Sequence, residues 1–115
     1  MINVAILGYG VIGSGTYRVL NDNAQIVAAN AGDEIKVKYV LDLREFPGSP
    51  IEDILTHDFN DIVNDESVDI VVEVMGGTGA AYKFVKASLE AGKNVVTSNK
   101  ALVAAYGPEL LKIAE

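Results

Sequence analysis

The sequence contains no cysteine and only one histidine. Without cysteine the chain has no disulfide framework, no thiolate nucleophile and no cysteine-ligated zinc site. A single imidazole also excludes a site built on paired histidines, so we expect no metal site. We interpret the one histidine, His57, as a surface side chain in a polar stretch.

Positive charge is scarce as well. Nine Lys and Arg residues stand against 16 Asp and Glu residues, which gives a net charge of -7. No basic cluster is present that would neutralise a row of phosphates, so nucleic acid is not an expected partner. No apolar run approaches the ~18 residues of a membrane span. No basic leader precedes the first hydrophobic run, and we therefore expect a cytoplasmic location without membrane contact.

What the chain does have is the size and composition of one globular domain. Its 115 residues are 50% apolar and 22% charged, which is too short for two domains and apolar enough for a core. We assign residues 1–115 to a single domain. The last residues, PELLKIAE, read as an unfinished helix, so we expect the chain to be a piece of a longer protein.

Strand and helix patterns alternate along the sequence. Runs of apolar residues predict strands at 2–7, 35–41, 54–56, 69–75 and 94–97. Helical periodicity predicts helices at 11–20, 24–30, 58–63, 82–89 and from Pro108 onward. Short connections between strands and helices indicate an α/β fold, a doubly wound parallel sheet of strand order 3-2-1-4-5 with helices on both faces.

The helix at 11–20 is expected to pack through one apolar face. Its apolar residues are Val11, Ile12, Tyr17, Val19 and Leu20. Helical spacing predicts that they face the sheet together.

A glycine motif lies between the first strand and this helix. Gly8-Tyr9-Gly10-Val11-Ile12-Gly13 matches the dinucleotide-binding fingerprint in its required place. Gly8 would allow the tight turn, Gly10 the approach of a pyrophosphate, and Gly13 the close packing of helix on strand. The amide groups at the helix start would bind the anion, so the motif predicts NAD or NADP as cofactor.

Two charged residues after the second strand are candidates for the adenosine ribose. Asp42 follows Gly13 by more than the usual ~20 residues, and the excess is accounted for if residues 24–31 add a helical piece. Asp42 would accept from the ribose hydroxyls of NAD, whereas Arg44 would pair with the 2'-phosphate of NADP. The sequence leaves this choice open.

Two further residues, Glu73 and Lys100, can be read in a structural or a functional role. Glu73 is a carboxylate within the strand DIVVEVM, where a buried charge needs partners. We favour a structural role for Glu73 over direct catalysis. Lys100 follows the last strand, where a lysine is most often a solvated charge.

Three segments together resemble a known family. LGYGVIGSG, DIVVEVMGG and AGKNVVTSNKALVAAYG are similar to the N-terminal NAD(P)-binding domain of homoserine dehydrogenase. The resemblance covers essentially the whole chain and implies a Rossmann-like domain of an oxidoreductase. That family interconverts L-aspartate 4-semialdehyde and L-homoserine in threonine, methionine and isoleucine biosynthesis. The domain of another two-domain amino-acid dehydrogenase and a non-catalytic NAD(P)-sensing module are the alternatives.

The resemblance also implies roles for single residues. Those implied to bind the pyrophosphate are Gly8, Gly10, Val11, Ile12 and Gly13. Those implied to lie along the nicotinamide half are Gly76, Gly77, Thr97 and Ser98, with Lys100 projecting into the active site as a catalytic residue. The Asp42-Leu43-Arg44 segment departs from the basic pattern of many members, so cofactor preference stays open.

The rest of the active site is implied to lie elsewhere. The second catalytic lysine, the substrate-binding acidic residues and most of a monovalent-cation site belong to a domain that this chain lacks. We therefore expect these 115 residues alone to be inactive, and we expect a homodimer formed through the absent domain.

Overall fold

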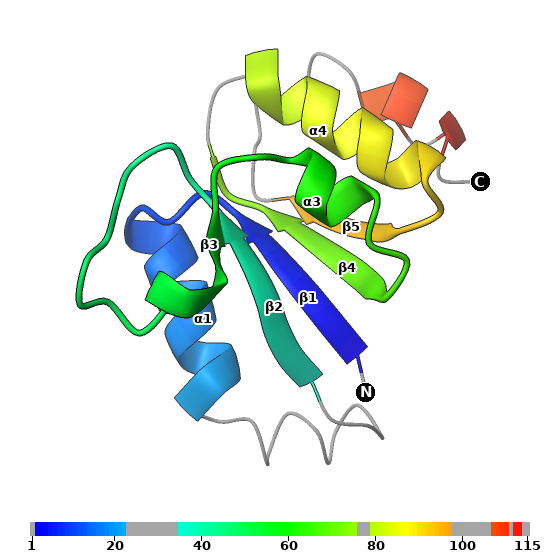
Figure 1. Ribbon diagram of the computed structural model, residues 1–115. Coiled ribbons are helices and arrows are strands. Elements are labelled where there is room, and N and C mark those ends of the chain that lie inside the picture. The colour runs from blue at the N-terminus through cyan, green and yellow to red at the C-terminus, as the bar shows by residue number, and fades with distance from the viewer. Residues whose placement is uncertain (1, 23–34, 76–78, 98–106, 111, 114–115) are drawn as a thin grey trace.

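The computed structural model describes residues 2–22, 35–75, 79–97, 107–110 and 112–113. Strands and helices alternate along the chain (Figure 1). The strands are β1 (Ile2–Leu7), β2 (Ile35–Leu41), β3 (Leu55–Thr56), β4 (Val68–Glu73) and β5 (Asn94–Thr97). The helices are α1 (Val11–Asp22), a 3-10 turn (Glu52–Ile54), α3 (Asn60–Val63) and α4 (Gly79–Glu90).

All five strands form one parallel sheet in the order β3-β2-β1-β4-β5. The predicted topology is therefore confirmed, and three predicted strands have the observed bounds. The predicted strand at 69–75 is displaced, because β4 begins at Val68 and its ladder ends at Glu73. The predicted helical piece at 24–30 lies outside the described residues.

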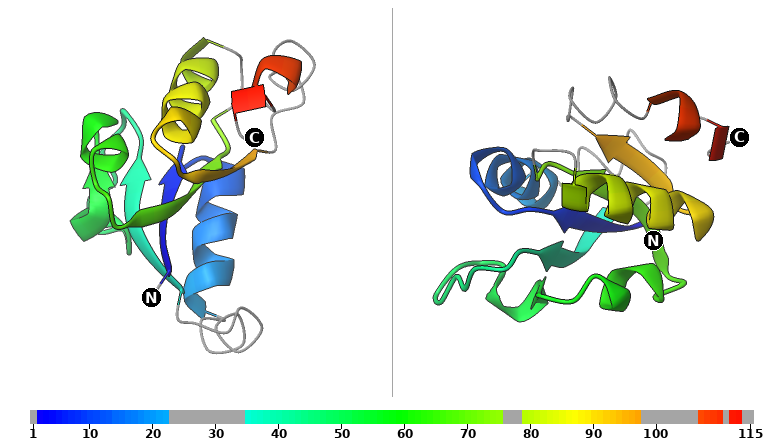
Figure 2. Two further views of the ribbon diagram at one scale, coloured as in Figure 1. Left: turned by 90° about the vertical axis from the view of Figure 1, so that its right-hand side faces the viewer. Right: turned by 90° about the horizontal axis from the view of Figure 1, so that it is seen from above.

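Helices cover both faces of the sheet. In β1, Ala5 and Leu7 belong to the cluster that includes Ile62 of α3 and packs against Phe84 of α4. The alternate residues of β1 belong to a second cluster, which packs against Tyr17 of α1. Because successive side chains of a strand point to opposite faces, α1 lies across the sheet from α3, as Figure 2 shows.

The apolar face of α1 is narrower than predicted. Tyr17 and Leu20 pack against the sheet, and Gly13 is buried on the same side. Ile12 and Val19 are 59% and 57% exposed, so the prediction that they belong to the buried face was wrong. Positions 13, 17 and 20 make one stripe at 100° per residue, and positions 12 and 19 lie about 100° away from it.

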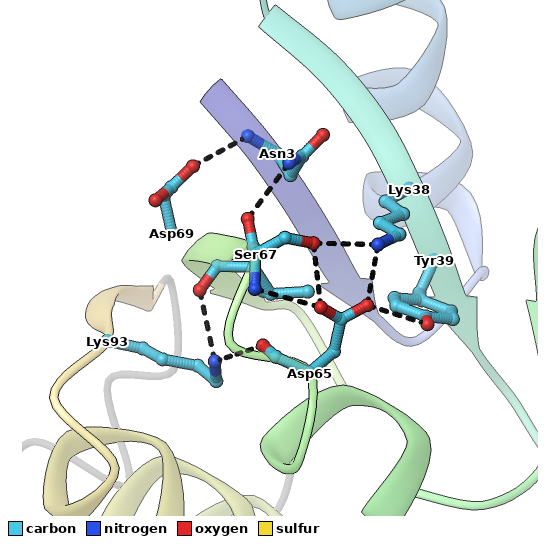
Figure 3. Close-up of polar contacts among 8 residues, drawn as sticks. Asn3, Lys38, Tyr39, Asp65, Ser67, Asp69 and Lys93 are labelled. Atoms are coloured by element: carbon cyan, nitrogen blue, oxygen red, sulfur yellow. Dashed lines mark hydrogen bonds and ion pairs between the residues drawn. The ribbon is translucent and has the colours of Figure 1, made fainter. Parts of the chain in front are cut away.

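A polar network holds the sheet together beside the amino end of β4 (Figure 3). The Asp65 carboxylate accepts hydrogen bonds from Lys38 Nζ at 2.7 Å, from the Tyr39 hydroxyl at 2.9 Å and from the Ser67 amide at 2.8 Å. The buried Lys93 ammonium donates to the Asp65 carbonyl at 2.8 Å. This network connects β2, β4 and the turn before β5. It lies toward the amino ends of the strands, whereas the glycine motif lies at their carboxyl ends.

The described helices are short. None of them is long and apolar enough to cross a membrane.

Candidate functional site

A cavity opens at the carboxyl ends of β1, β2 and β4. Its volume of about 470 Å³ is in the usual range for small-ligand sites. The lining includes Gly8, Gly10, Asp42, Arg44, His57, Met75 and Phe84. In doubly wound sheets, ligands bind outside the carboxyl ends of the strands where the strand order reverses. This cavity occupies that position, between β1 and its neighbours β2 and β4.

Two of the motif glycines, Gly8 and Gly13, have the structural roles that their spacing predicts. Gly8 has φ +100°, and a Cβ there would press against the Met75 backbone at 3.2 Å. A Cβ on Gly13 would overlap the Gly8 carbonyl oxygen. A Cβ on Gly10 would meet nothing within 4 Å. The backbone is therefore open to solvent at the position where the fingerprint predicts the approach of a pyrophosphate.

The first turn of α1 adds backbone amides that suit an anion. Gly10 precedes the helix, and its carbonyl accepts the first helical bond from the Ser14 amide at 2.9 Å. The first N–H groups of a helix have no acceptor within the helix and form the positive end of its dipole. Val11, Ile12 and Gly13 occupy this turn, so their amides are available to a phosphate group. These residues fit the diphosphate of NAD or NADP.

Asp42 and Arg44 are brought together as an ion pair. The Arg44 guanidinium contacts the Asp42 carboxylate through Nη2 at 2.9 Å and Nε at 3.1 Å. Asp42 also accepts from the amides of Arg44 at 3.0 Å and Tyr9 at 2.9 Å. The Arg44 guanidinium first of all, and then these two amides, hold the pKa of the Asp42 carboxyl well below its ordinary value of 3.8.

The Arg44 side chain keeps most of its surface exposed to solvent despite this pairing. Its side chain is 63% exposed, whereas that of Asp42 is 10% exposed. Arg44 also lies over the Phe46 ring at 5.2 Å. An arginine that is exposed and oriented in this way can turn one edge to a second anion while the carboxylate stays in place.

His57 belongs to this site, which the sequence analysis missed. The residue follows β3 directly and lines the cavity together with Asp42 and Arg44. Its ring nitrogens contact the Asp42 carbonyl and the Glu45 carboxylate. Part of its ring is exposed, as expected, but its surroundings are not simply solvent. Its place directly after a predicted edge strand was the available signal, because parallel strands end at a common edge.

Glu73 joins the ends of β4 and β5. Its side chain is fully buried. One carboxylate oxygen accepts from the Met75 amide at 2.7 Å and the other from the Thr97 hydroxyl at 2.6 Å. Glu73 and Thr97 are register partners in the parallel ladder. The buried carboxylate therefore fixes the Thr97 hydroxyl at the edge where the cavity opens.

The remaining predicted site residues cannot be placed. Gly76, Gly77, Ser98 and Lys100 lie outside the described residues. Within the described part of the chain, no group of three or more His, Asp or Glu side chains is arranged to hold a metal ion.

Comparison with known proteins identifies what this arrangement is similar to. Residues 8–115 match the family model described as homoserine dehydrogenase, NAD binding domain. A homoserine dehydrogenase of Neisseria gonorrhoeae is 39% identical over 99% of this chain, and one of Mycobacterium bovis is 41% identical over 99%. The chain spans only about a quarter of these relatives, 27% and 26% of their respective lengths.

Solved structures agree with the sequence comparison. A crystal structure of S. aureus homoserine dehydrogenase superimposes with a TM-score of 0.88 at 34% identity, covering 98% of this chain and 30% of that one. The homoserine dehydrogenase of Thiobacillus denitrificans gives a TM-score of 0.87 at 39% identity, covering 98% and 27%. In both cases the similarity extends over nearly the whole chain.

Proposed function

This chain belongs to the homoserine dehydrogenase family, to its NAD-binding domain, and on that premise we propose that it forms the cofactor half of an active site interconverting L-aspartate 4-semialdehyde and L-homoserine. When bound, the reduced nicotinamide supplies the hydride for the aldehyde carbon. The binding residues belong to this chain. Substrate recognition is assigned to residues outside it, because the relatives are about four times as long.

One observation supports the proposal above all others. The backbone is open at Gly10 and closed at Gly8 and Gly13, directly before a helix and beside a cavity at the reversal of strand order. A Cβ at Gly15, Gly48 or Gly79 would also meet nothing within 4 Å. The place of Gly10, directly before α1 and beside the cavity, is therefore what supports the proposal. A turn that binds a diphosphate needs that free space.

The residues of β4 and β5 are proposed to position the nicotinamide end. Glu73 holds the Thr97 hydroxyl by a 2.6 Å hydrogen bond, and Thr97 is the last residue of β5. We assign contacts with the nicotinamide to Thr97 and Ser98 and with the same half of the cofactor to Gly76 and Gly77. These assignments rest on the family resemblance, with the Glu73 contact as support for Thr97.

Lys100 is proposed as the catalytic residue of this half-site. Reduction of an aldehyde builds negative charge on its oxygen, and a fixed ammonium group near that oxygen lowers the barrier. Lys100 would also orient the substrate. A cytoplasmic location and a homodimer formed through residues outside this chain complete the proposal.

The test is an assay of the full-length protein and of this chain alone. We expect the full-length protein to oxidise NADPH or NADH with L-aspartate 4-semialdehyde, and the 115 residues alone to bind the cofactor without turnover. Turnover with another amino-acid precursor but not with this aldehyde would assign the domain to a different dehydrogenase. Binding without turnover of any such substrate by the full-length protein would indicate an NAD(P)-sensing module.

A further inference from the structure

His57 has an oxygen acceptor at each ring nitrogen. Nδ1 lies 2.6 Å from the Asp42 carbonyl oxygen, and Nε2 lies 2.9 Å from Glu45 Oε1. A carbonyl and a carboxylate oxygen accept hydrogen bonds and donate none, whereas a neutral imidazole has only one N–H. Both contacts are hydrogen bonds only when both ring nitrogens carry a proton. The observed geometry is therefore that of the imidazolium cation.

The surroundings of His57 favour the same charged form. The Asp42 carbonyl first, and then the Glu45 carboxylate, raise the pKa of the His57 ring above its ordinary value of 6.5. His57 also borders a second hollow next to α4. The charged groups that border the two hollows or contact the ring are Asp42, Arg44, Glu45, Asp58 and Lys83.

The partner of His57 Nε2 is easily displaced. The Glu45 side chain is 78% exposed and the His57 side chain 44%, so solvent screens their attraction and the pair contributes little. A second anion that enters the cavity can take the place of Glu45 without leaving a buried charge behind. The Nδ1 contact with Asp42 would stay and keep the ring in orientation.

We propose that His57 is a specificity-determining residue of the cofactor site. Its protonated imidazole binds the 2'-phosphate of NADP(H) together with Arg44. Both side chains line the same cavity as Asp42, which the fingerprint spacing assigns to the ribose. Nε2–H would exchange Glu45 for a phosphate oxygen, and Arg44 would supply the second charge-assisted contact. NAD(H) carries no phosphate at this position and would gain nothing from the charge.

This inference rests on the proposed function, since it deepens the binding of NAD(P) at the same cavity. It adds a dependence on pH that the glycine motif does not have. As pH rises through the pKa of His57, the protein should lose affinity for NADPH and keep its affinity for NADH. The preference between the two cofactors therefore becomes a function of pH.

The experiment measures the dissociation constants of NADPH and NADH from about pH 6 to about pH 8.5, the range in which histidine titrates. We use calorimetry on the full-length protein, its His57→Gln variant and its Lys83→Gln variant. In the wild type, the ratio of NADPH to NADH affinity should fall about tenfold across this range, as expected for loss of one hydrogen bond between charged groups. In His57→Gln the ratio should not fall with pH.

Two controls separate this effect from others. The 2'-phosphate itself titrates at about pH 6. The His57→Gln variant shows how that titration alone changes the ratio of the two affinities. Lys83→Gln removes one positive charge from the other side of His57 and should retain the wild-type pH profile. A wild-type ratio that changes with pH in the same way as the ratio of His57→Gln would overturn the inference. Failure to bind either cofactor at any pH would instead contradict the proposed function.

Discussion

The Tyr9 amide donates a hydrogen bond to the Asp42 carboxylate at 2.9 Å, which joins the middle of the glycine motif to the end of β2, 33 positions later in the sequence. The same carboxylate accepts two hydrogen bonds from the Arg44 side chain. Asp42 thus orients both the turn that we propose to face the diphosphate and the arginine that we propose to face the ribose end. One acidic side chain therefore holds both parts of the proposed cofactor site in place.

Arg44→Ala should weaken the binding of NADPH more than that of NADH. The guanidinium is largely exposed at the cavity, and its loss should cost NADPH about 1–3 kcal/mol, the contribution of a charge-assisted contact. Titration calorimetry with each cofactor measures the difference. Lys36→Ala, which removes an exposed charge from β2 outside the cavity, is the matched control. Equal losses of affinity for both cofactors would show that Arg44 does not contact the 2'-phosphate.

Gly10→Val and Gly13→Val should fail in different ways. A side chain on Gly10 enters open space, so the fold should persist while the diphosphate is excluded and affinity for both cofactors falls by at least about tenfold. A side chain on Gly13 overlaps the Gly8 carbonyl, so this variant should lose stability as well. Thermal unfolding and calorimetry distinguish the two results. Unchanged affinity in a folded Gly10→Val protein would refute the site.

The fold was predictable because its signals are local. The strands at 2–7, 35–41 and 94–97 are short apolar runs that end at glycine or polar residues, and the fingerprint identifies the turn between the first strand and α1. The structural roles of Gly8 and Gly13 and the role proposed for Gly10 follow from one motif with well-understood geometry. These parts of the site needed no knowledge of contacts between distant residues.

The rest of the site depends on contacts between distant residues. His57 and Asp42 are 15 positions apart, and Thr97 and Glu73 are 24 positions apart, so no local pattern reveals either pair. The error on Ile12 and Val19 has a similar origin. Helical periodicity shows that several residues share a side, but the position of α1 on the sheet decides which stripe becomes buried.

The Asp65 network should make stability depend on pH. The Lys38 ammonium first, then the Ser67 hydroxyl and amide, hold the pKa of the Asp65 carboxyl below its ordinary value of 3.8. A carboxyl group with a lowered folded-state pKa adds stability above its unfolded pKa, and that stability is lost as pH falls through the folded pKa. Asp65→Asn should therefore lower the free energy of unfolding at pH 7.

Urea unfolding of the wild type and of Asp65→Asn, from pH 7 down to about pH 3, tests this expectation. The difference between the two proteins should stay level down to about pH 4, near the unfolded-state pKa, and should shrink below it as the carboxyl of the unfolded wild type takes up a proton. Asp69→Asn is the control, because Asp69 is exposed and accepts a hydrogen bond from the Asn3 amide. A difference that stays constant over the whole range would show that Asp65 acts through packing rather than charge.

Glu73→Leu and Glu73→Gln should separate the structural role of this buried carboxylate from its positioning role. Leucine leaves the Met75 amide and the Thr97 hydroxyl without the acceptor seen here, which should cost about 1–3 kcal/mol of stability for each donor. Glutamine keeps an oxygen for Met75 and offers an amide N–H to Thr97, so the protein should stay folded.

In Glu73→Gln the Thr97 hydroxyl becomes an acceptor toward residue 73 and directs its own proton elsewhere. We expect a lower catalytic rate with nearly unchanged binding of adenosine fragments such as 2',5'-ADP. Thr97→Ser, made in the otherwise wild-type enzyme, keeps the hydroxyl and is the control. Its catalytic rate should stay near that of the wild type. A Glu73→Gln enzyme with full turnover would leave Glu73 a structural role only.

Lys100→Ala should affect turnover far more than cofactor binding. The aldehyde oxygen gains negative charge only as the hydride arrives, so an ammonium group near it stabilises the transition state more than the ground state. In the full-length enzyme, the variant should lose roughly 100-fold or more of the catalytic rate and keep its NADPH affinity within a few fold. Steady-state kinetics and calorimetry on the same preparation give both quantities.

Lys100→Arg distinguishes a positioned ammonium from a general requirement for positive charge. The guanidinium is larger and forked, so it should not restore the rate fully where a compact charge is needed. Full recovery with arginine would mean that charge alone is sufficient. Near-normal turnover in Lys100→Ala would show instead that Lys100 is a solvated loop residue and that other groups stabilise the charge on the aldehyde oxygen.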